Sequence, residues 1–338
     1  MRVVVVGATG NLGTAVLTRL QAESTVTEIV GIARRAPRLA SPPYGDVEWF
    51  TIDIGEDGAS DALTAAFEGA DAVIHLAWAM QPNHKKAVLE RTNVTGTRNV
   101  LRSVVAAGVP QVVVASSVGA YSRGPKRRLV DETWRTKGVR RSHYAQHKSA
   151  NEKMLNSFAR AYPDTIVTRM RPGLVLQRHA AAEIIGLFAG RRIPTRWMRH
   201  VRPPFLPLSP RFVSQVVHAD DVADAFWRAI DRRASGAFNL AAEPVVDSSD
   251  VAHAFGSHLV PVPYRVLRVI VWATWMLRLQ KTDPGWLDIA AKVPVMSTER
   301  AREVLGWAPE HTAHETLAEF AHGVANRSNV EASHPLRG

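Results

Sequence analysis

The chain has 338 residues, which by the usual size of domains is enough for roughly two domains with sizeable cores. Apolar residues make up 46% and charged residues 22%, a balance that excludes a disordered, collagen-like or coiled-coil chain, and the absence of cysteine excludes disulfide frameworks, thiol nucleophiles, iron–sulfur clusters and cysteine-ligated zinc. The 42 Lys and Arg against 31 Asp and Glu give a net charge of +11, which favours an anionic partner unless the arginines are simply dispersed over the surface.

Short apolar segments alternate with longer mixed segments in the first half of the chain. We expect strands at 2–6, 28–32, 47–52, 72–76, 112–115 and 166–169, since these are almost continuously apolar, as strands covered on both faces must be. The segments between them predict helices at 12–21, 59–67, 88–107 and 144–162. Strands that alternate with helices indicate an α/β fold with a doubly wound parallel (Rossmann) sheet, which we assign to residues 1–175.

The pattern changes after Gly173. Prolines interrupt 191–210, where we expect loop and short helix rather than sheet core. A strand at 213–217, and a helix capped by Asp220-Asp221 that runs to about Ile230, are expected to return to the Rossmann sheet. The rest of 176–326 is predicted to form a smaller, mostly helical substrate domain, and 327–338 a frayed tail.

Two apolar segments are too short to span a membrane. The four apolar residues before Gly7 are fewer than a signal peptide requires, and Arg268 and Arg278 leave nine uncharged residues within 266–279, where a spanning helix needs about 20. We expect a cytoplasmic protein with no stable membrane insertion. The segment 266–279 is more typical of a core or of a homodimer surface than of a lipid contact; an apolar substrate lid or membrane-facing surface is the alternative.

A glycine-rich loop follows the first expected strand and opens the first expected helix. Glycine is needed where the chain turns tightly and where backbone approaches a pyrophosphate, and the helix N-terminus offers free N–H groups to the phosphates. This position predicts a dinucleotide-binding loop. Its candidate cofactor-binding residues are Gly7, Thr9, Gly10, Asn11, Leu12 and Gly13.

Tyr144 and Lys148 lie four residues apart at the start of a predicted helix and therefore project from one face. A tyrosine is a poor base at its ordinary pKa of about 10, but a neighbouring ammonium and an oxidised nicotinamide would both lower the pKa of the phenol. Ser117, after the fifth expected strand, is a candidate to hydrogen bond the reacting oxygen. These three residues are the predicted catalytic set.

The end of the second expected strand indicates the cofactor. An NAD site needs a carboxylate there for the ribose hydroxyls, but Ala33 occupies that position and no Asp or Glu occurs between Glu28 and Asp46. Arg34 and Arg35 offer guanidinium groups suited to a 2′-phosphate. The sequence therefore predicts that NADP(H) is preferred and that NAD(H) is also possible.

Taken together, these motifs resemble the extended short-chain dehydrogenase/reductases, the NAD(P)-dependent epimerase/dehydratase family. The resemblance is colinear over nearly the whole chain. The motifs are Gly7/Gly10/Gly13, Asp53-Ile54, His75-Leu76-Ala77, Asn93-Val94-Thr95-Gly96-Thr97, Ser116-Ser117, Tyr121, Tyr144/Lys148, Arg171-Pro172-Gly173, Val217-His218-Ala219-Asp220-Asp221-Val222 and Leu305-Gly306-Trp307.

The resemblance implies roles for further residues. Asp53 and Ile54 should bracket the adenine, Leu76 and Ala77 should line the nicotinamide ribose, and Asn93 should support the site. The remaining residues implied by the resemblance are Ser116 and Pro172 beside the cofactor, and Trp78, Ser117 and Arg171 toward the substrate. Trp78 is a departure, since many relatives have glycine there, and it puts a bulky apolar wall near the cofactor.

Three functions follow from these motifs. The leading one is hydride transfer between a nicotinamide and a carbonyl or carbinol carbon of a bulky small molecule; the alternatives are a nucleotide-sugar epimerase/dehydratase and a regulator that senses dinucleotide without turnover. Basic residues in 123–148 and 184–219 are expected at the mouth of the site, either as a solvated rim or to hold an anionic ligand. The scattered histidines have no ligand spacing, so we expect no metal, and without a recognition module we expect no nucleic acid.

Overall fold

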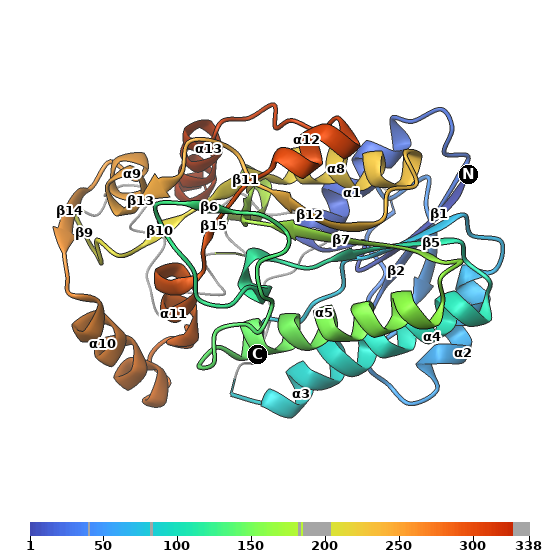
Figure 1. Ribbon diagram of the computed structural model, residues 1–338, viewed down its shortest axis with the longest axis horizontal. Helices are drawn as coiled ribbons and strands as arrows, with labels where there is room; N and C mark the ends of the chain where they lie inside the picture. The colour runs from blue at the N-terminus through green and yellow to red at the C-terminus, as the bar shows by residue number, and fades with distance from the viewer. Residues whose placement is uncertain (40, 82–83, 182–183, 185–203, 327–338) are drawn as a thin grey trace.

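A seven-stranded parallel sheet forms the centre of the computed structural model (Figure 1), in the order β12-β7-β5-β4-β1-β2-β3. The structure describes residues 1–39, 41–81, 84–181, 184 and 204–326. The strands are β1 Arg2–Val6, β2 Glu28–Ala33, β3 Glu48–Thr51, β4 Ala72–His75, β5 Gln111–Ala115, β7 Ile166–Pro172 and β12 Gly236–Leu240. The doubly wound α/β fold is confirmed, and six of these strands lie where the apolar runs predict them.

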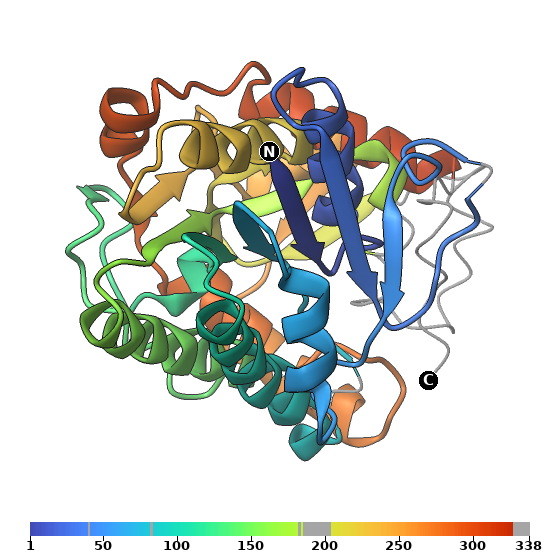
Figure 2. The same ribbon diagram turned by 90° about the vertical axis from the view of Figure 1, so that its right-hand side faces the viewer.

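Helices cover both faces of the sheet (Figure 2), and each face has its own apolar core. One face packs against α1 Asn11–Gln21 and α8 Ala219–Asp231, the other against α2 Ala59–Phe67, α4 Gly96–Ala106 and α5 His143–Ala161. The single helix predicted at 88–107 is divided into α3 Lys86–Glu90, a π-helical turn at Arg91–Thr95, and α4. Such π turns are frequent at functional sites, and this one contains Asn93.

Within the described ranges, four two-stranded sheets lie outside the central one. They are β8 Leu174–Leu176 with β11 Val216–His218, β10 Val213–Ser214 with β13 Val246–Asp247, β9 Phe205–Leu208 with β14 His258–Pro261, and β6 Leu129–Val130 with β15 Val295–Met296. The strand predicted at 213–217 is therefore two short strands. Gln215 separates them, because its side chain hydrogen bonds the backbone N and O of Met296.

Two other sequence-based expectations need correction. Residues 205–208 of the proline-interrupted segment form a strand, since Pro207 tolerates the edge position of a two-stranded sheet. The N-cap of α8 is His218, whose Nδ1 accepts from Asp220 N at 3.2 Å, rather than Asp220-Asp221. Asp221 instead accepts from the backbone N of Glu310 and of His311.

The C-terminal half is mainly helical, as expected. Its helices after α8 are α9 Ser248–Ala254, α10 Tyr264–Met276, α11 Gly285–Lys292, α12 Glu299–Leu305 and α13 Ala313–Asn326. Of the segment 213–230, which was expected to return to the Rossmann sheet, only helix α8 packs on the central sheet; the short strands before it do not join that sheet. The predicted tail at 327–338 and the basic segment from Arg191 to Arg202 lie outside the described residues. Within the described ranges, no helix is both long and apolar enough to cross a bilayer.

Candidate active site

The glycine loop joins β1 to α1 and approaches the chain that follows β4. Gly7 has φ +91°, and a Cβ there would lie 2.6 Å from the backbone N of Ala77; a Cβ on Gly13 would lie 2.4 Å from the carbonyl oxygen of Gly7. Side chains at these two positions would therefore collide with backbone. At Gly10 the corresponding Cβ would make only an ordinary contact, 3.5 Å from the Gly7 oxygen. Backbone therefore packs closely against the loop at Gly7 and Gly13, whereas the side of the loop at Gly10 is open.

The N-terminus of α1 is suited to a phosphate. Its N-cap is Gly10, which has no side chain to cap the helix, and the first turn contains no acidic residue. The N–H groups and the positive end of the helix dipole therefore face the loop without a competing carboxylate. Asn11 is held from the C-terminal half, since Gln177 Nε2 donates to its backbone oxygen at 2.9 Å.

The residues expected to contact the adenosine of the cofactor lie just after β2 and β3. Arg34 and Arg35 follow β2 and are exposed. Asp53 accepts from the backbone N of Gly55 at 3.0 Å and pairs with Arg91 at 3.3 Å. Ile54 is 4% exposed and packs in the core beneath α4, which leaves little of its side chain free to contact a ligand.

Asn93 holds the loop after β4 in place. Its Oδ1 accepts from the backbone N of Ala79 at 2.7 Å, and its Nδ2 donates to the Ala79 oxygen at 2.8 Å. The backbone N groups of Leu76 and Ala77 both donate to Val6 O, at 2.8 and 2.9 Å. This segment, which carries Trp78, is thereby fixed between the glycine loop and the start of α5.

The three predicted catalytic residues meet at the carboxyl end of β5. Ser117 hydrogen bonds Tyr144, and Ser117 Oγ also accepts from the backbone N of Gly119 at 3.0 Å. A Cβ on Gly119 would lie 2.7 Å from Tyr144 Cε1, so the close approach of the ring requires glycine. Lys148, one turn along α5, is 4% exposed and donates to the Ala115 oxygen at 2.7 Å.

Two tryptophans enclose the phenol ring of Tyr144. The Trp78 ring packs edge-on with centroids 5.5 Å apart, and the Trp286 ring lies at 4.7 Å. Lys148 Nζ lies 3.6 Å from the centroid of Trp78, a cation–π contact. Trp286 comes from α11, which the sequence analysis did not connect with the site, because no local pattern places residue 286 beside residue 144.

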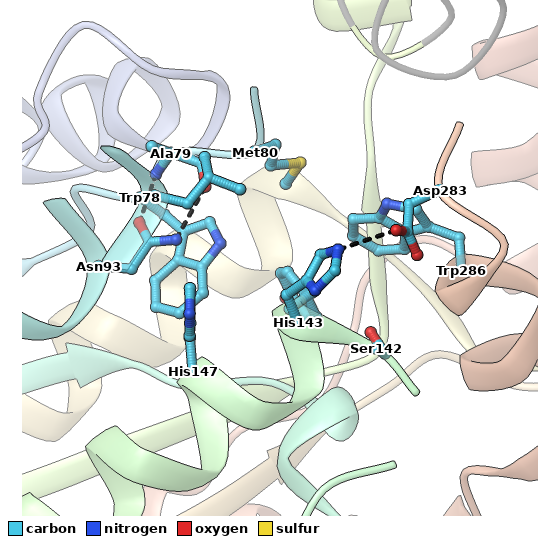
Figure 3. Close-up of a pocket in the computed structure, with 11 residues that line it drawn as sticks. Trp78, Ala79, Met80, Asn93, Ser142, His143, His147, Asp283 and Trp286 are labelled. Atoms are coloured by element: carbon cyan, nitrogen blue, oxygen red, sulfur yellow. Dashed lines mark hydrogen bonds and ion pairs between the residues drawn. The ribbon is translucent and has the colours of Figure 1, made fainter. Parts of the chain in front are cut away.

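These groups line a narrow pocket, partly open to solvent, with a cavity volume of about 20 Å³. Its walls are largely apolar and come from the loop after β4, from α5 and from α11 (Figure 3). The lining residues are Trp78, Ala79, Met80, Leu89, Asn93, Ser142, His143, Tyr144, His147, Asp283 and Trp286. One of the dashed contacts in Figure 3 joins His143 Nε2 to Asp283 Oδ2 at 2.8 Å and links the C-terminal part to α5.

Burial is the main cause of the pKa shifts of Tyr144 and Lys148. It raises the pKa of Tyr144 to about 12, with Ser117 opposing, and lowers the pKa of Lys148 to about 7, with Glu152 opposing. Burial therefore opposes the lowering of the tyrosine pKa that Lys148 and an oxidised nicotinamide are expected to cause, and that lowering stays a prediction. The lysine nitrogen lies 5.8 Å from the Tyr144 ring centroid and is directed to the Ala115 oxygen and Trp78 instead.

A buried ion pair between Arg171 and Glu152 lies beside the site and is joined to it through Ser116. Arg171 Nε and Nη2 donate to the two oxygens of Glu152, both at 2.8 Å, and Arg171 Nη1 donates to Tyr121 Oη at 2.9 Å. Ser116 Oγ donates to Glu152 Oε1 at 2.6 Å. Ser116 and Arg171 are both buried in this network beside Ser117, and their expected contacts with cofactor and substrate stay predictions.

Comparison with known proteins agrees with this geometry. The model of the NAD dependent epimerase/dehydratase family matches residues 3–241. The chain belongs to that family. A UDP-glucose 4-epimerase of Mycolicibacterium smegmatis is 27% identical over 97% of this chain and 100% of that protein. An L-arabinose 1-dehydrogenase of Haloferax volcanii is 32% identical over 34% of this chain and 41% of that one.

Other relatives extend the comparison. An uncharacterized Mycobacterium tuberculosis protein is 27% identical over 97% of this chain, which spans only 30% of the length of that relative. The structure of UDP-glucose 4-epimerase from Thermus thermophilus in complex with NAD matches with TM-score 0.71 and 22% identity over 96% of this chain and 99% of that one. At that identity the likeness shows a shared fold, which agrees with the observed sheet order.

The residues of this family member fit a nicotinamide dinucleotide. The Gly10 side of the loop and the uncapped start of α1 would hold the pyrophosphate, and Leu76 and Ala77, just after β4, and Pro172, at the end of β7, border this edge of the sheet. Among the described residues, His, Asp and Glu form no group of three that could hold a metal ion.

We expect replacement of Lys148 by Met to stabilise the cofactor-free protein at neutral pH, by on the order of a few kcal/mol. The pKa of Lys148 is about 7 in the folded state, against about 10.4 for a free lysine, so between these values the unfolded state binds more protons. The stability gained by the variant is therefore largest below about pH 7 and shrinks as the pH rises toward 10.

Denaturant unfolding of both proteins from about pH 6 to pH 10 measures this difference. Lys153→Met is the matched control, because Lys153 is exposed on the same helix. A Lys148→Met variant whose stability tracks the parent at every pH would contradict the argument that burial disfavours the ammonium.

Proposed function

We propose that this protein is an NAD(P)-dependent oxidoreductase that moves hydride between the cofactor and the carbonyl or carbinol carbon of a bulky, partly apolar small molecule. The observation that carries the proposal is the position of the Tyr144 phenol, between two tryptophans and hydrogen bonded to Ser117. A dinucleotide-sensing regulator would not need this proton-transfer set, which favours an enzyme over that alternative.

The side chains present account for the proton in the reaction. With its pKa raised to about 12, the Tyr144 hydroxyl is protonated at neutral pH and is suited to donate to a substrate carbonyl oxygen. Ser117 Oγ, held by Gly119 N, orients the same oxygen. Lys148 lies one helical turn away with a pKa of about 7, and in its protonated form it favours the phenolate left after donation. The nicotinamide, when bound, supplies or accepts the hydride.

The pocket walls support the substrate class. Trp78, Met80, Leu89 and Trp286 present apolar surface beside Tyr144, and this surface favours an apolar or aromatic group next to the reacting carbon. The other walls carry polar side chains, from Asn93, Ser142, His143, His147 and Asp283.

Cofactor absorbance tests the proposal. The purified protein with NADPH or NADH is offered aryl and alicyclic ketones on one side and UDP-glucose on the other. We expect net cofactor oxidation with at least one ketone class. Turnover of UDP-glucose to its epimer with no net absorbance change, and no ketone reduction, would contradict it.

A nucleotide-sugar epimerase is the second candidate. The observation that favours it is the 27% identity to a UDP-glucose 4-epimerase over the full length of that protein. Its signature is conversion of the sugar with cofactor recycled on the protein, which product analysis after incubation with UDP-glucose detects. Trp78, which narrows the site beside Lys148, is the feature that favours the first candidate.

We further propose that NADPH binds more tightly than NADH, by on the order of tenfold, about 1.4 kcal/mol. Arg34 and Arg35 are exposed at the end of β2, and neither makes an ion pair with another described residue, so both are available for a 2′-phosphate. Arg34→Ala should remove most of the difference and leave NADH affinity nearly unchanged.

Titration of both cofactors at moderate salt measures this preference. Arg102→Ala is a suitable control, because Arg102 is exposed on α4 and far along the chain from β2. Equal dissociation constants for NADPH and NADH in the parent protein would reject the preference.

A further inference from the structure

Helix α10, Tyr264–Met276, presents apolar side chains to solvent. Figure 1 shows it at one end of the molecule, away from the central sheet. The exposed side chains are Val266 (50%), Val269 (61%), Ile270 (51%), Trp272 (49%) and Met276 (56%), which we call the outer face of α10. None of the residues of this helix is buried, so the expectation that the segment forms core is wrong.

The opposite side of α10 is already in contact with the protein. Tyr264 Oη donates to Asp288 of α11, and Arg268 Nε donates to the same carboxylate at 3.1 Å. The Trp275 ring stacks on His84 with centroids 4.3 Å apart. These contacts set the rotation of the helix, and the spacing of Val266, Val269 and Ile270 then directs their side chains outward together.

A helix that is apolar on its outward side as well as its inward side needs something to cover it. Two more apolar side chains are exposed on the strands that pair before α10, Phe205 of β9 at 61% and Val260 of β14 at 39%. Single exposed apolar residues are ordinary, but this many on one short helix form a patch of the kind that binds a partner or a membrane.

The charged residues around α10 indicate which kind of partner covers its outer face. No Asp or Glu occurs between Asp250 and Asp283, whereas this interval contains Arg265, Arg268, Arg278 and Lys281. Arg265 and Arg278 are exposed at either end of the outer face. Apolar and aromatic side chains flanked by basic residues, on a protein of net charge +11, match the surface of a bilayer that contains anionic lipid.

We propose that α10 is an interfacial helix that binds this protein to the surface of membranes containing anionic lipid. With 13 residues it lies along the surface and does not cross it. Its outer face enters the headgroup region, and Arg265 and Arg278 contact lipid phosphates. The chain after α10 leads directly to Asp283 and Trp286 of the pocket wall, so binding brings that wall close to the bilayer.

Vesicle flotation of the full chain tests the proposal. The probes are vesicles of phosphatidylcholine alone and of phosphatidylcholine with about 30% phosphatidylglycerol. We expect the partition coefficient to be at least about tenfold higher on the anionic vesicles and to fall as salt is raised. Val269→Asp/Ile270→Asp should lower anionic partition at least about tenfold, and Arg265→Glu severalfold.

Matched controls separate the outer face from general surface effects. Val304→Asp, at a 38% exposed valine on α12, and Arg102→Glu on α4 should leave partition unchanged. Thermal unfolding and cofactor titration establish that each variant is folded. Equal partition onto both vesicle types, or none on either, overturns the proposal.

Self-association gives a distinct outcome. If sedimentation velocity without lipid shows a dimer that Val269→Asp/Ile270→Asp converts to monomer, and the parent does not float with anionic vesicles, a second copy covers the outer face and the proposal is wrong.

Discussion

Tyr144→Phe should reduce turnover by at least about 100-fold while cofactor affinity and thermal stability stay near the parent values. The change removes one hydroxyl and keeps the ring between Trp78 and Trp286, so the pocket retains its shape. What is lost is the proton donor and its hydrogen bond with Ser117. Single-turnover absorbance, cofactor titration and thermal unfolding measure the three quantities.

Tyr162→Phe is the matched control, because Tyr162 is 42% exposed just beyond the end of the same helix. It should leave turnover unchanged. If Tyr144→Phe retains parental turnover, Tyr144 has no part in proton transfer and the proposed mechanism is wrong.

Glu152→Gln should lower the free energy of unfolding by about 3 to 5 kcal/mol, because it leaves the Arg171 cation buried without a counter-charge. Both side chains are almost fully buried, at 0% and 4% exposure, and they share two hydrogen bonds. Glutamine keeps the shape but not the charge. Denaturant unfolding at neutral pH measures the loss.

The surface pair Arg302–Glu243 provides the comparison, since its side chains are 51% and 72% exposed. Glu243→Gln should change stability by less than about 1 kcal/mol. Removing both partners, as Glu152→Met/Arg171→Met, should recover part of the loss in Glu152→Gln. Equal stability of Glu152→Gln and the parent would show that the ion pair contributes nothing net.

The pH dependence of the Glu152 contribution follows from its pKa, which Arg171 and Ser116 hold below the ordinary value although burial opposes them. A carboxyl with a lowered folded pKa binds fewer protons when folded than when unfolded in the acid range. Its contribution is therefore complete above the unfolded pKa and is lost as the pH falls, so the parent and Glu152→Gln should converge in acid.

The local sequence was sufficient to predict the strands and the glycine loop of the Rossmann half of the molecule. The runs at 2–6, 28–32 and 72–76 are apolar on both faces, and a strand of that kind has few alternatives to the centre of a parallel sheet. Gly7 and Gly13 could be singled out because the loop geometry itself forbids a Cβ at both. Tyr144 and Lys148 could be paired because a helix brings residues four apart onto one face.

Sequence reasoning failed where pairing depends on distant segments. The seventh strand β12 lies beside β7 although they are far apart in the chain, and its short mixed sequence has no periodicity to distinguish it. The broken strand at 213–217 has the same origin, because Gln215 turns to bond Met296. Strand position is decided by which edge remains open after the other elements have packed.

The chemistry of the candidate site divides in the same way. The sequence by itself determined the family and predicted the glycine loop and the proton-transfer residues, since each depends on neighbours within a few residues. Only the tertiary structure brought Trp286 of α11 and Asp283, just before that helix, against α5 and buried Lys148 under Trp78. It also decided the direction of both pKa shifts, because desolvation depends on everything that packs around a group, and no stretch of chain encodes that on its own.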